Sequence, residues 1–457
     1  MKFFCKTASL TCAIVVLAMK GMAQEPVTLN RLFDMADAQS WKIRVSQSGL
    51  DASSEAVAAA KSALLPSVNL SANGSYIGDA TLMSRGFSTS GTTDVILAGL
   101  GPQKVTNGGQ PTPHWGNTFS VQATQVIYAG GAIRAGIRMA ELGEKMAYLD
   151  VEKNRQEVRF LIAGYYLDLY KLHNQLEVVR ENIGITEKLI KNMEARHEQG
   201  TVLKNDIIRY ELQLKNLQLT EEKLMDATSI INHQLVTTLH LDENAIIVPD
   251  TLLLHAESQS LKDVVSQNLW QQRAEQNNIG IKQASVAEEI AGHKVRKSRA
   301  ASLPSVAFVA EDKLFGPYTS DLIPVNANVN AWFVGIGVKY SLSSIWSNKH
   351  TIRKAKFEHR QAAEQVNLAR EGVENGVQAC FVNFLTAFKE VETQEKQVEL
   401  AEQNYGVVNN RYGESLALLT DMLDASAMKL NAEMELVNAR MSLLYNYYKL
   451  KYLTNTL

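Results

Sequence analysis

The stretch ALLPSVNLSA at residues 63–72 decides the fold, because it returns almost unchanged as ASLPSVAFVA at residues 301–310. Each copy follows a run rich in Ala, Lys, Glu and Val, breaks at a proline, and then alternates polar with apolar residues. Proline ends a helix because it lacks the backbone N–H, and period-two alternation is typical of a half-buried strand. We therefore expect one helix-to-strand junction, marked by Pro66 and Pro304, to be built twice about 240 residues apart.

Two further pairs of segments match between the halves of the chain. TLNRLFDMADAQ (28–39) resembles SLKDVVSQNLWQ (260–271) in the placing of its apolar residues, and ARHEQGTVLKNDIIRYELQL (195–214) aligns with NRYGESLALLTDMLDASAMKL (410–430). Each half is thus predicted to contain a short helix, a helix, a strand, a loop, a strand, a long helix, a tight turn and a returning helix. An internal duplication explains the recurrence, with a first repeat at 24–245 and a second at 246–457.

Two tracts of the chain are free of proline, one between Pro113 and Pro249 and one after Pro324. Proline costs a helix interior about 3 kcal/mol or more, so both tracts can hold very long helices. A helix over 132–198 would be about 100 Å long at 1.5 Å per residue. Sustained steps of three and four residues predict coiled-coil packing along two seams: Leu169, Leu172, Leu176, Val179, Ile183, Thr186, Ile190 and Met193, then Tyr210, Leu214, Leu217, Glu221, Leu224, Thr228, Ile231 and Leu235.

Four segments show strand periodicity instead. Their apolar residues alternate with small or polar ones: Val68, Leu70 and Ala72; Phe119, Val121 and Ala123; Val306, Phe308 and Ala310; and Trp332, Val334, Ile336, Val338 and Tyr340. Glycine and proline crowd the loop expected over 74–116, and a shorter loop is expected over 312–330. The strands suit either a soluble sandwich or a membrane sheet, and Trp332 and Tyr340 fit interfacial aromatic positions at two ends of one strand.

Membrane insertion would require several copies of the chain. Strands of about ten residues are long enough to cross a bilayer when tilted. However, four strands cannot close a barrel, and lipid does not tolerate an open sheet edge. If these strands enter a membrane, copies of the chain must therefore share one barrel.

Composition indicates an exported protein that is neither a nucleic-acid binder nor an enzyme of a familiar kind. Residues 1–23 have the basic start, short apolar core and small residues of a secretory signal. Removing it changes the net charge from −2 to −5 and leaves Cys380 as the one cysteine, and no later segment is apolar enough for a transmembrane helix. Phosphate-binding, nucleophile-elbow, zinc-protease and Cys-x-x-Cys motifs are missing from the sequence, so no cofactor, metal or catalytic residue is expected.

The order of elements, the paired Leu-Pro-Ser-Val junctions and the turn RYG…DMLDA (411–425) resemble the outer-membrane efflux proteins of the TolC type. The resemblance covers essentially the whole mature chain. It implies a mainly helical fold and a homotrimer in the outer membrane, in which each chain gives four strands to a twelve-stranded barrel and its helices to a long periplasmic tunnel. It also implies a passive exit duct for a tripartite efflux pump or a type I secretion system, docked to a periplasmic adaptor and an inner-membrane transporter.

The two helix-to-helix turns are the candidate working sites of such a duct. Gly200 and Gly413 can supply left-handed backbone at the ends of the descending helices. Asp206 and Asp421 lie near the starts of the returning helices, where the helix dipole favours a carboxylate. For Asp206 the alternative to this capping role is a contact between helices at the tip. Asp421 and Asp424, three residues apart, share one helix face. By resemblance they would narrow the periplasmic entrance as a ring of six carboxylates that favours cations, and the alternative is that they are plain surface aspartates.

Other residues beside the turns allow two interpretations each. Arg196, Arg411 and Tyr412 either hold neighbouring helices together through hydrogen bonds or cover apolar surface. By resemblance, the residues that would meet an adaptor are Thr201, Val202, Leu203, Leu416, Ala417 and Leu418, together with Gly200 and Gly413. The alternative is that these residues pack inside their own hairpins. For the whole protein, the alternative to a duct is an exported structural or adhesive coiled coil with no conducting role.

Overall fold

A computed structural model describes residues 27–76, 81–82, 103–104, 114–250, 266–319, 324–325, 327–414 and 416–457. The predicted signal peptide and most of the predicted 74–116 loop lie outside these residues. The contacts divide the chain into two compact units. One, called here the long-helix unit, contains the chain up to Ser53, Glu144–Glu288 and Ala362–Leu457, and the other, the sheet unit, contains Ser54–Gly143 and Glu289–Gln361.

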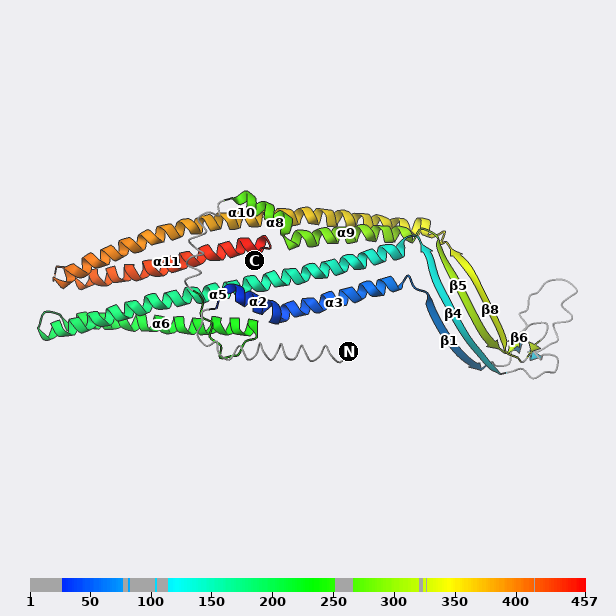
Figure 1. Cartoon of the computed structure of the whole chain (residues 1–457), viewed down its shortest axis with the longest axis horizontal. Coiled ribbons are helices and arrows are strands. Elements are labelled where there is room, and N and C mark those ends of the chain that lie inside the picture. Colours follow the sequence, from blue (N-terminus) through cyan, green and yellow to red (C-terminus); the bar gives the residue numbers. More distant parts are fainter. Residues whose placement is uncertain are drawn as a thin grey trace. The chain divides into compact units, whose positions relative to one another are not determined.

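Four long antiparallel strands form the centre of the sheet unit (Figure 1). They are β1 (Ser67–Tyr76), β4 (Trp115–Ala129), β5 (Ser305–Gly316) and β8 (Val329–Lys339), hydrogen-bonded in the order β1-β4-β5-β8. Two short pairs accompany them, β2 (Thr81–Leu82) with β3 (Gln103–Lys104) and β6 (Tyr318–Thr319) with β7 (Pro324–Val325). The four predicted strands are confirmed, but they extend into both predicted loops, because pairing continues through polar residues that the alternation did not include.

The register separates an apolar from a polar face of this sheet. One cross-strand row joins Leu70, Val121, Asp312 and Trp332, and the next row on the same face joins Val68, Ala123, Ala310 and Val334. The opposite face carries Ser71 beside Ser120, whose hydroxyls lie 2.8 Å apart. Leu70 is 78% exposed. The apolar face and the two edge strands, β1 and β8, therefore have no cover among the described residues.

Helix ends join this sheet through tight junctions. The helices are α3 (Trp41–Ser62), α5 (Ala132–Glu198), α9 (Ile279–Ala300) and α10 (Ser344–Gly413). Gly130, between β4 and α5, has φ +61°, and a Cβ there would lie 2.7 Å from the Ala300 carbonyl oxygen, so the site requires glycine. The Asn348 amide donates to the Ser298 carbonyl oxygen (2.7 Å) and the Ser302 hydroxyl (2.9 Å). The start of α10 is thereby fixed to the end of α9.

Eight helices contribute to the described part of the long-helix unit. α2 (Leu29–Gln39), α6 (Lys204–Leu239), α8 (Gln267–Asn277) and α11 (Leu419–Leu453) lie wholly within it, and α3, α5, α9 and α10 each contribute one part. The bounds of α5 coincide with the helix predicted over 132–198. Every residue of both predicted seams is buried or half-buried, so the coiled-coil stepping is confirmed.

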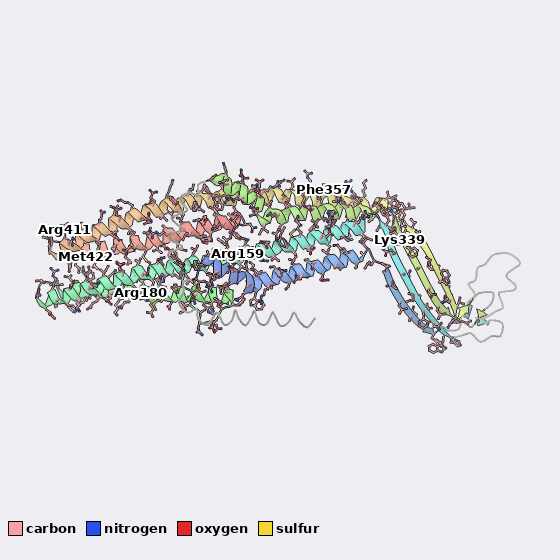
Figure 2. All side chains as sticks on the ribbon, in the orientation of Figure 1. Arg159, Arg180, Lys339, Phe357, Arg411 and Met422 are labelled. Carbon is pink, nitrogen blue, oxygen red and sulfur yellow. The ribbon has the colours of Figure 1, made fainter. Side chains whose placement is uncertain are left out.

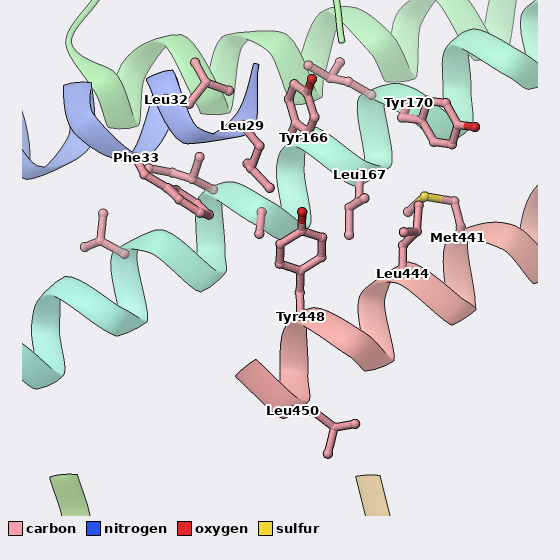
Figure 3. Packing of buried hydrophobic residues seen from close by; sticks show 14 of the residues in the cluster. Leu29, Leu32, Phe33, Tyr166, Leu167, Tyr170, Met441, Leu444, Tyr448 and Leu450 are labelled. Atoms are coloured by element: carbon pink, nitrogen blue, oxygen red, sulfur yellow. The ribbon is translucent and has the colours of Figure 1, made fainter. Parts of the chain in front are cut away.

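The main core of this unit lies where α2 crosses α5 and α11. Leu29, Leu32 and Phe33 of α2 face Tyr166 and Leu167 of α5, with Leu444 and Tyr448 of α11 opposite (Figure 3). The buried Tyr166 hydroxyl donates to the Val27 carbonyl oxygen and accepts the Asp250 N–H, each at 2.8 Å. These contacts hold two connecting segments against the middle of α5.

The same order of elements occurs twice along the chain. α8, α9 and β5 each start 238 residues after α2, α3 and β1. This spacing makes the predicted match of 28–39 with 260–271 wrong by six residues, and residues 260–265 lie outside the described part. The buried pair Leu32 and Ala36 corresponds instead to the buried pair Trp270 and Ala274. Apolar steps of three and four residues can be aligned in more than one register, which explains the error.

Candidate functional site at the hairpin tips

The first hairpin turn reverses the chain between α5 and α6. Gly200 adopts φ +74°, as predicted, and its N–H bonds the His197 carbonyl oxygen at 2.8 Å. The Thr201 hydroxyl and N–H both donate to the Arg196 carbonyl oxygen, at 2.8 and 3.0 Å. Asp206 lies in the first turn of α6, where the helix dipole favours its carboxylate. Together these contacts satisfy carbonyl groups that the end of α5 leaves free.

The second hairpin turn, between α10 and α11, is built differently. Gly413 is the last residue of α10 and does not have positive φ, so the predicted left-handed backbone is wrong for this residue. The helix instead closes through the Glu414 and Leu416 N–H groups, which bond the carbonyl oxygens of Asn410 (3.2 Å) and Arg411 (2.7 Å). Asp421 accepts the Leu418 N–H at 3.0 Å and so caps the start of α11.

A buried apolar cluster joins the two hairpins near their turns, and we call it the tip cluster. Its buried members come from three helices: Met193 of α5, Ile207 and Tyr210 of α6, and Leu419 and Met422 of α11. Figure 2 labels Met422 at this end of the long-helix unit, beside Arg411. Half-buried residues complete the tip cluster: Leu189, Ile190, Val202, Tyr405, Val408, Tyr412 and Leu423. The two turns therefore share one core.

Polar groups at the edge of the tip cluster link the hairpins as well. An Arg196 guanidinium N–H donates to the Gly413 carbonyl oxygen at 3.0 Å, from one hairpin to the other. Burial raises the pKa of the Tyr412 hydroxyl, Arg196 lowers it and Asp206 raises it further, so both charges lie close to this ring. Arg411 donates to Leu416 within its own turn, at 3.4 Å. Of the predicted residues Arg196, Arg411 and Tyr412, Arg196 is thus the one that forms a hydrogen bond between the hairpins.

Asp421 and Asp424 lie outside the tip cluster. Both side chains are exposed, whereas Leu419, Met422 and Ala425 form the buried face of the same helix turns. The exposed residues of the two turns are also apolar in part, with Leu203 at 71% and Leu418 at 69% exposed. Leu416 and Thr201 are exposed too, while Val202 and Ala417 are half-buried. Packing inside one hairpin therefore does not account for Leu203, Leu416 and Leu418.

Above the tip cluster, α5 and α11 meet through polar side chains that the seam prediction did not include. The Gln175 amide donates to the Asn438 side-chain oxygen at 3.0 Å. Two helical turns further along α5, the buried Asn182 amide donates to the Glu433 carboxylate at 3.3 Å. Lys429 forms an ion pair with the same carboxylate at 3.4 Å. Gln175 and Asn182 are seven residues apart, which is one heptad repeat of a coiled coil. This spacing is the sequence feature that could have predicted the polar contacts between the two helices.

Stability is expected to depend on pH through Glu433. Burial raises the pKa of this carboxyl, although Lys429 and Asn182 oppose the rise. A group whose pKa is raised by folding stabilises the fold below its unfolded pKa, and this contribution is lost as pH rises through the folded pKa. The melting temperature of the wild type relative to Glu433→Gln should therefore rise as pH falls toward the ordinary range of carboxyl groups.

Glu141→Gln provides a control of opposite sign. Hydrogen bonding to Arg138 lowers the pKa of the Glu141 carboxyl, so its contribution is present above the unfolded pKa and is lost on acidification. The advantage of the wild type over this variant should shrink as pH falls. If the difference in melting temperature between wild type and variant changes in the same direction with pH for both variants, at least one of the two pKa assignments is wrong.

No group of His, Cys, Asp and Glu among the described residues has the arrangement of a metal site. Among the same residues, no helix has an apolar stretch long enough to cross a membrane.

A known protein family matches most of this chain. The profile of the outer membrane efflux protein family covers residues 32–237 and 270–456. The chain belongs to this family. It is 20% identical over 458 residues to the outer membrane protein TolC of Salmonella enteritidis, spanning 97% of this chain and 85% of that protein. Membership places the chain in the outer membrane and in efflux transport.

Solved structures show the same fold. VceC from Vibrio cholerae matches with a TM-score of 0.72 at 16% identity, over 93% of this chain and 96% of that one. The open state of the MtrE outer membrane channel from Neisseria gonorrhoeae matches with a TM-score of 0.69 at 14% identity, over 93% and 88% of the two chains. The mainly helical architecture with a small four-stranded antiparallel sheet is therefore that of outer membrane efflux proteins.

Proposed function

We propose that the chain is the subunit of a trimeric exit duct that crosses the outer membrane and extends into the periplasm. The observation that carries this proposal is a four-stranded sheet joined to helices tens of ångströms long, with an apolar face and two edge strands that no described residue covers. Lipid would cover the apolar face, and three copies would close a twelve-stranded barrel in which no edge remains.

Exposed apolar stripes on the long-helix unit support an assembly of several copies. One runs along α6 and the other along α10, at intervals that keep each on one helix face. Their members are Ile208, Leu212, Leu219 and Ile230 on α6, and Val382, Leu400 and Val407 on α10. A neighbouring copy that placed its α6 against this α10 would cover both stripes and continue the ring of helices.

The organisation of the chain fits the same proposal. A signal peptide at 1–23 would direct export, and the repeats at 24–245 and 246–457 would each give one strand pair and one helical hairpin to the duct. The equal spacing of α2, α3 and β1 from α8, α9 and β5 supports a duplication.

The tip would be both gate and docking surface. Asp421 and Asp424 would form a ring of six carboxylates in the trimer, which favours passage of cations and resists anions. Contacts in the tip cluster and from Arg196 would hold the hairpins together, and partner binding would shift the population toward an open arrangement. The exposed Leu203, Leu416 and Leu418 would meet a periplasmic adaptor, which links the duct to an inner-membrane transporter.

Single-channel recording in planar bilayers tests this function. We expect cation-selective openings from the purified mature chain, and a loss of that selectivity in Asp421→Asn/Asp424→Asn. The exposed pair Asp226→Asn/Glu222→Gln on α6, farther from the turns, serves as a control of equal charge change. The control should keep the selectivity of the wild type.

Two other results would separate the parts of the proposal. Unchanged selectivity in the double variant would keep the duct and remove the two aspartates from its gate. A folded trimer with no conductance in any lipid would contradict the duct and favour the structural coiled coil.

A further inference from the structure

Positive charge is concentrated where the helices meet the sheet. Within the sheet unit, the helical residues are 54–62, 132–143, 289–300 and 344–361. They carry twelve Lys and Arg against four Asp and Glu, whereas the net charge of the whole chain is −2. All twelve cationic side chains are exposed. A local excess of this size in a mildly acidic protein indicates an anionic partner.

Only part of this charge is neutralised within the chain. Glu141 pairs with Arg138 at 2.6 Å and with Lys61 at 3.6 Å, and Glu358 pairs with Lys294 at 2.8 Å and Lys354 at 3.8 Å. The other eight cations form no ion pair among the described residues: Arg134, Arg296, Lys297, Arg299, Lys349, Arg353, Lys356 and Arg360. Internal salt bridges therefore do not explain them.

Six of these eight cations surround the helix-to-strand junctions, and we call them the basic collar. They are Arg134 on α5, Arg296, Lys297 and Arg299 on α9, and Lys349 and Arg353 on α10. At 1.5 Å per residue, each lies within about 14 Å of the helix end next to the sheet. Figure 2 labels Lys339 where β8 ends at this level. The fixed contact between Asn348 and the end of α9 holds the α9 and α10 members close together.

Exposed apolar side chains occupy the junctions between the basic collar and the sheet. They are Leu64, Leu65, Tyr128, Leu303, Tyr340, Leu342, Ile345 and Trp346. Aliphatic and aromatic side chains beside a row of Lys and Arg are typical of a surface that lies at the boundary of a lipid bilayer. The headgroup layer on each side of a bilayer is about 5–8 Å thick, so the long side chains of the basic collar span it.

We propose that the basic collar binds the phosphate groups of anionic phospholipids in the leaflet at the helix end of the sheet. The lipid assignment rests on the proposed insertion of the sheet in the membrane. Phosphate fits this surface because arginine donates two parallel hydrogen bonds to it and lysine supplies a point charge. The apolar residues at the junctions fit the acyl chains and glycerol region of the same lipids.

Phosphatidylglycerol binding to the full trimer tests this proposal. The wild type should retain phosphatidylglycerol in preference to phosphatidylcholine in native mass spectrometry, and salt should weaken the preference. Each cation near an anionic surface contributes about fivefold in affinity. The variant Arg296→Gln/Lys297→Gln/Arg299→Gln/Lys349→Gln should therefore bind phosphatidylglycerol at least about tenfold more weakly. Lys188→Gln/Lys191→Gln/Lys223→Gln/Lys389→Gln removes the same charge from exposed positions of the long-helix unit and should bind like the wild type.

Several results would overturn the lipid assignment. Equal retention of the two lipids by the wild type, or unchanged retention by the collar variant, would do so. Full competition by inorganic phosphate would assign the surface to free phosphate. A collar variant with normal lipid binding but altered ion selectivity would place these cations along the conduit. Insertion and conductance in pure phosphatidylcholine test the duct alone, so a failure of the duct and a failure of the collar are distinguishable.

Discussion

Leu70→Arg is expected to prevent insertion of the protein into the outer membrane. Leu70 lies in the middle of β1 on the mainly apolar face of the sheet, in the row with Val121, Asp312 and Trp332. An arginine on the lipid face of a membrane barrel costs about 2–4 kcal/mol near the bilayer centre. A trimer carries the change three times, which amounts to about 6–12 kcal/mol. The measurements are cell fractionation and the detection of heat-resistant trimers on gels. The variant should be absent from the outer-membrane fraction and from the trimer band.

Ser71→Arg is the matched control for this prediction. Ser71 is the next residue of the same strand, and it lies on the polar face beside Ser120. In a closed barrel this face lines the lumen, where water solvates the arginine. This variant should therefore insert and form trimers, with a reduced conductance. If Leu70→Arg inserts as well as Ser71→Arg, the apolar face does not contact lipid and the membrane barrel is wrong.

The order and the approximate positions of the long elements could be predicted because local chemistry determines them. α3 and α9 end four residues before Pro66 and Pro304, which cannot continue a helix. The alternation after each proline leaves one sheet face apolar. The long helix after Gly131 follows from a tract without proline and from sustained apolar steps of three and four. These signals depend on near neighbours in the sequence, so no knowledge of tertiary packing was needed.

What the sequence did not predict depends on contacts between distant residues. The seam residue Met193 was expected to be buried, but periodicity does not say that it shares a buried cluster with Met422 of the other hairpin. Gly413 was expected to end its helix in left-handed backbone, and a longer turn closed by Leu416 removes that need. The basic collar was also missed, because its charge is cancelled in the total by acidic residues elsewhere.

Met422→Ala is expected to raise the open probability of the channel. Met422 is fully buried in the tip cluster, which also contains Met193 of the other hairpin and Leu419 of its own. Truncating a buried methionine to alanine costs about 2–5 kcal/mol, because transfer energy is lost and a cavity remains. If opening separates the two hairpins, this cost falls on the closed arrangement alone. Open probability in planar bilayers should then rise by at least about tenfold, since every 1.4 kcal/mol changes an equilibrium tenfold.

Met428→Ala is the control, because Met428 lies on the same helix and is 59% exposed. It should leave both the open probability and the melting temperature close to the wild type. Arg196→Ala should act in the same direction as Met422→Ala but less strongly, since it removes one hydrogen bond to the Gly413 carbonyl oxygen. A lower melting temperature for Met422→Ala with an unchanged open probability would mean that the tip cluster stabilises the fold without holding the gate. The hairpins would then move together during opening, and the restraint on the gate would have to lie between neighbouring copies.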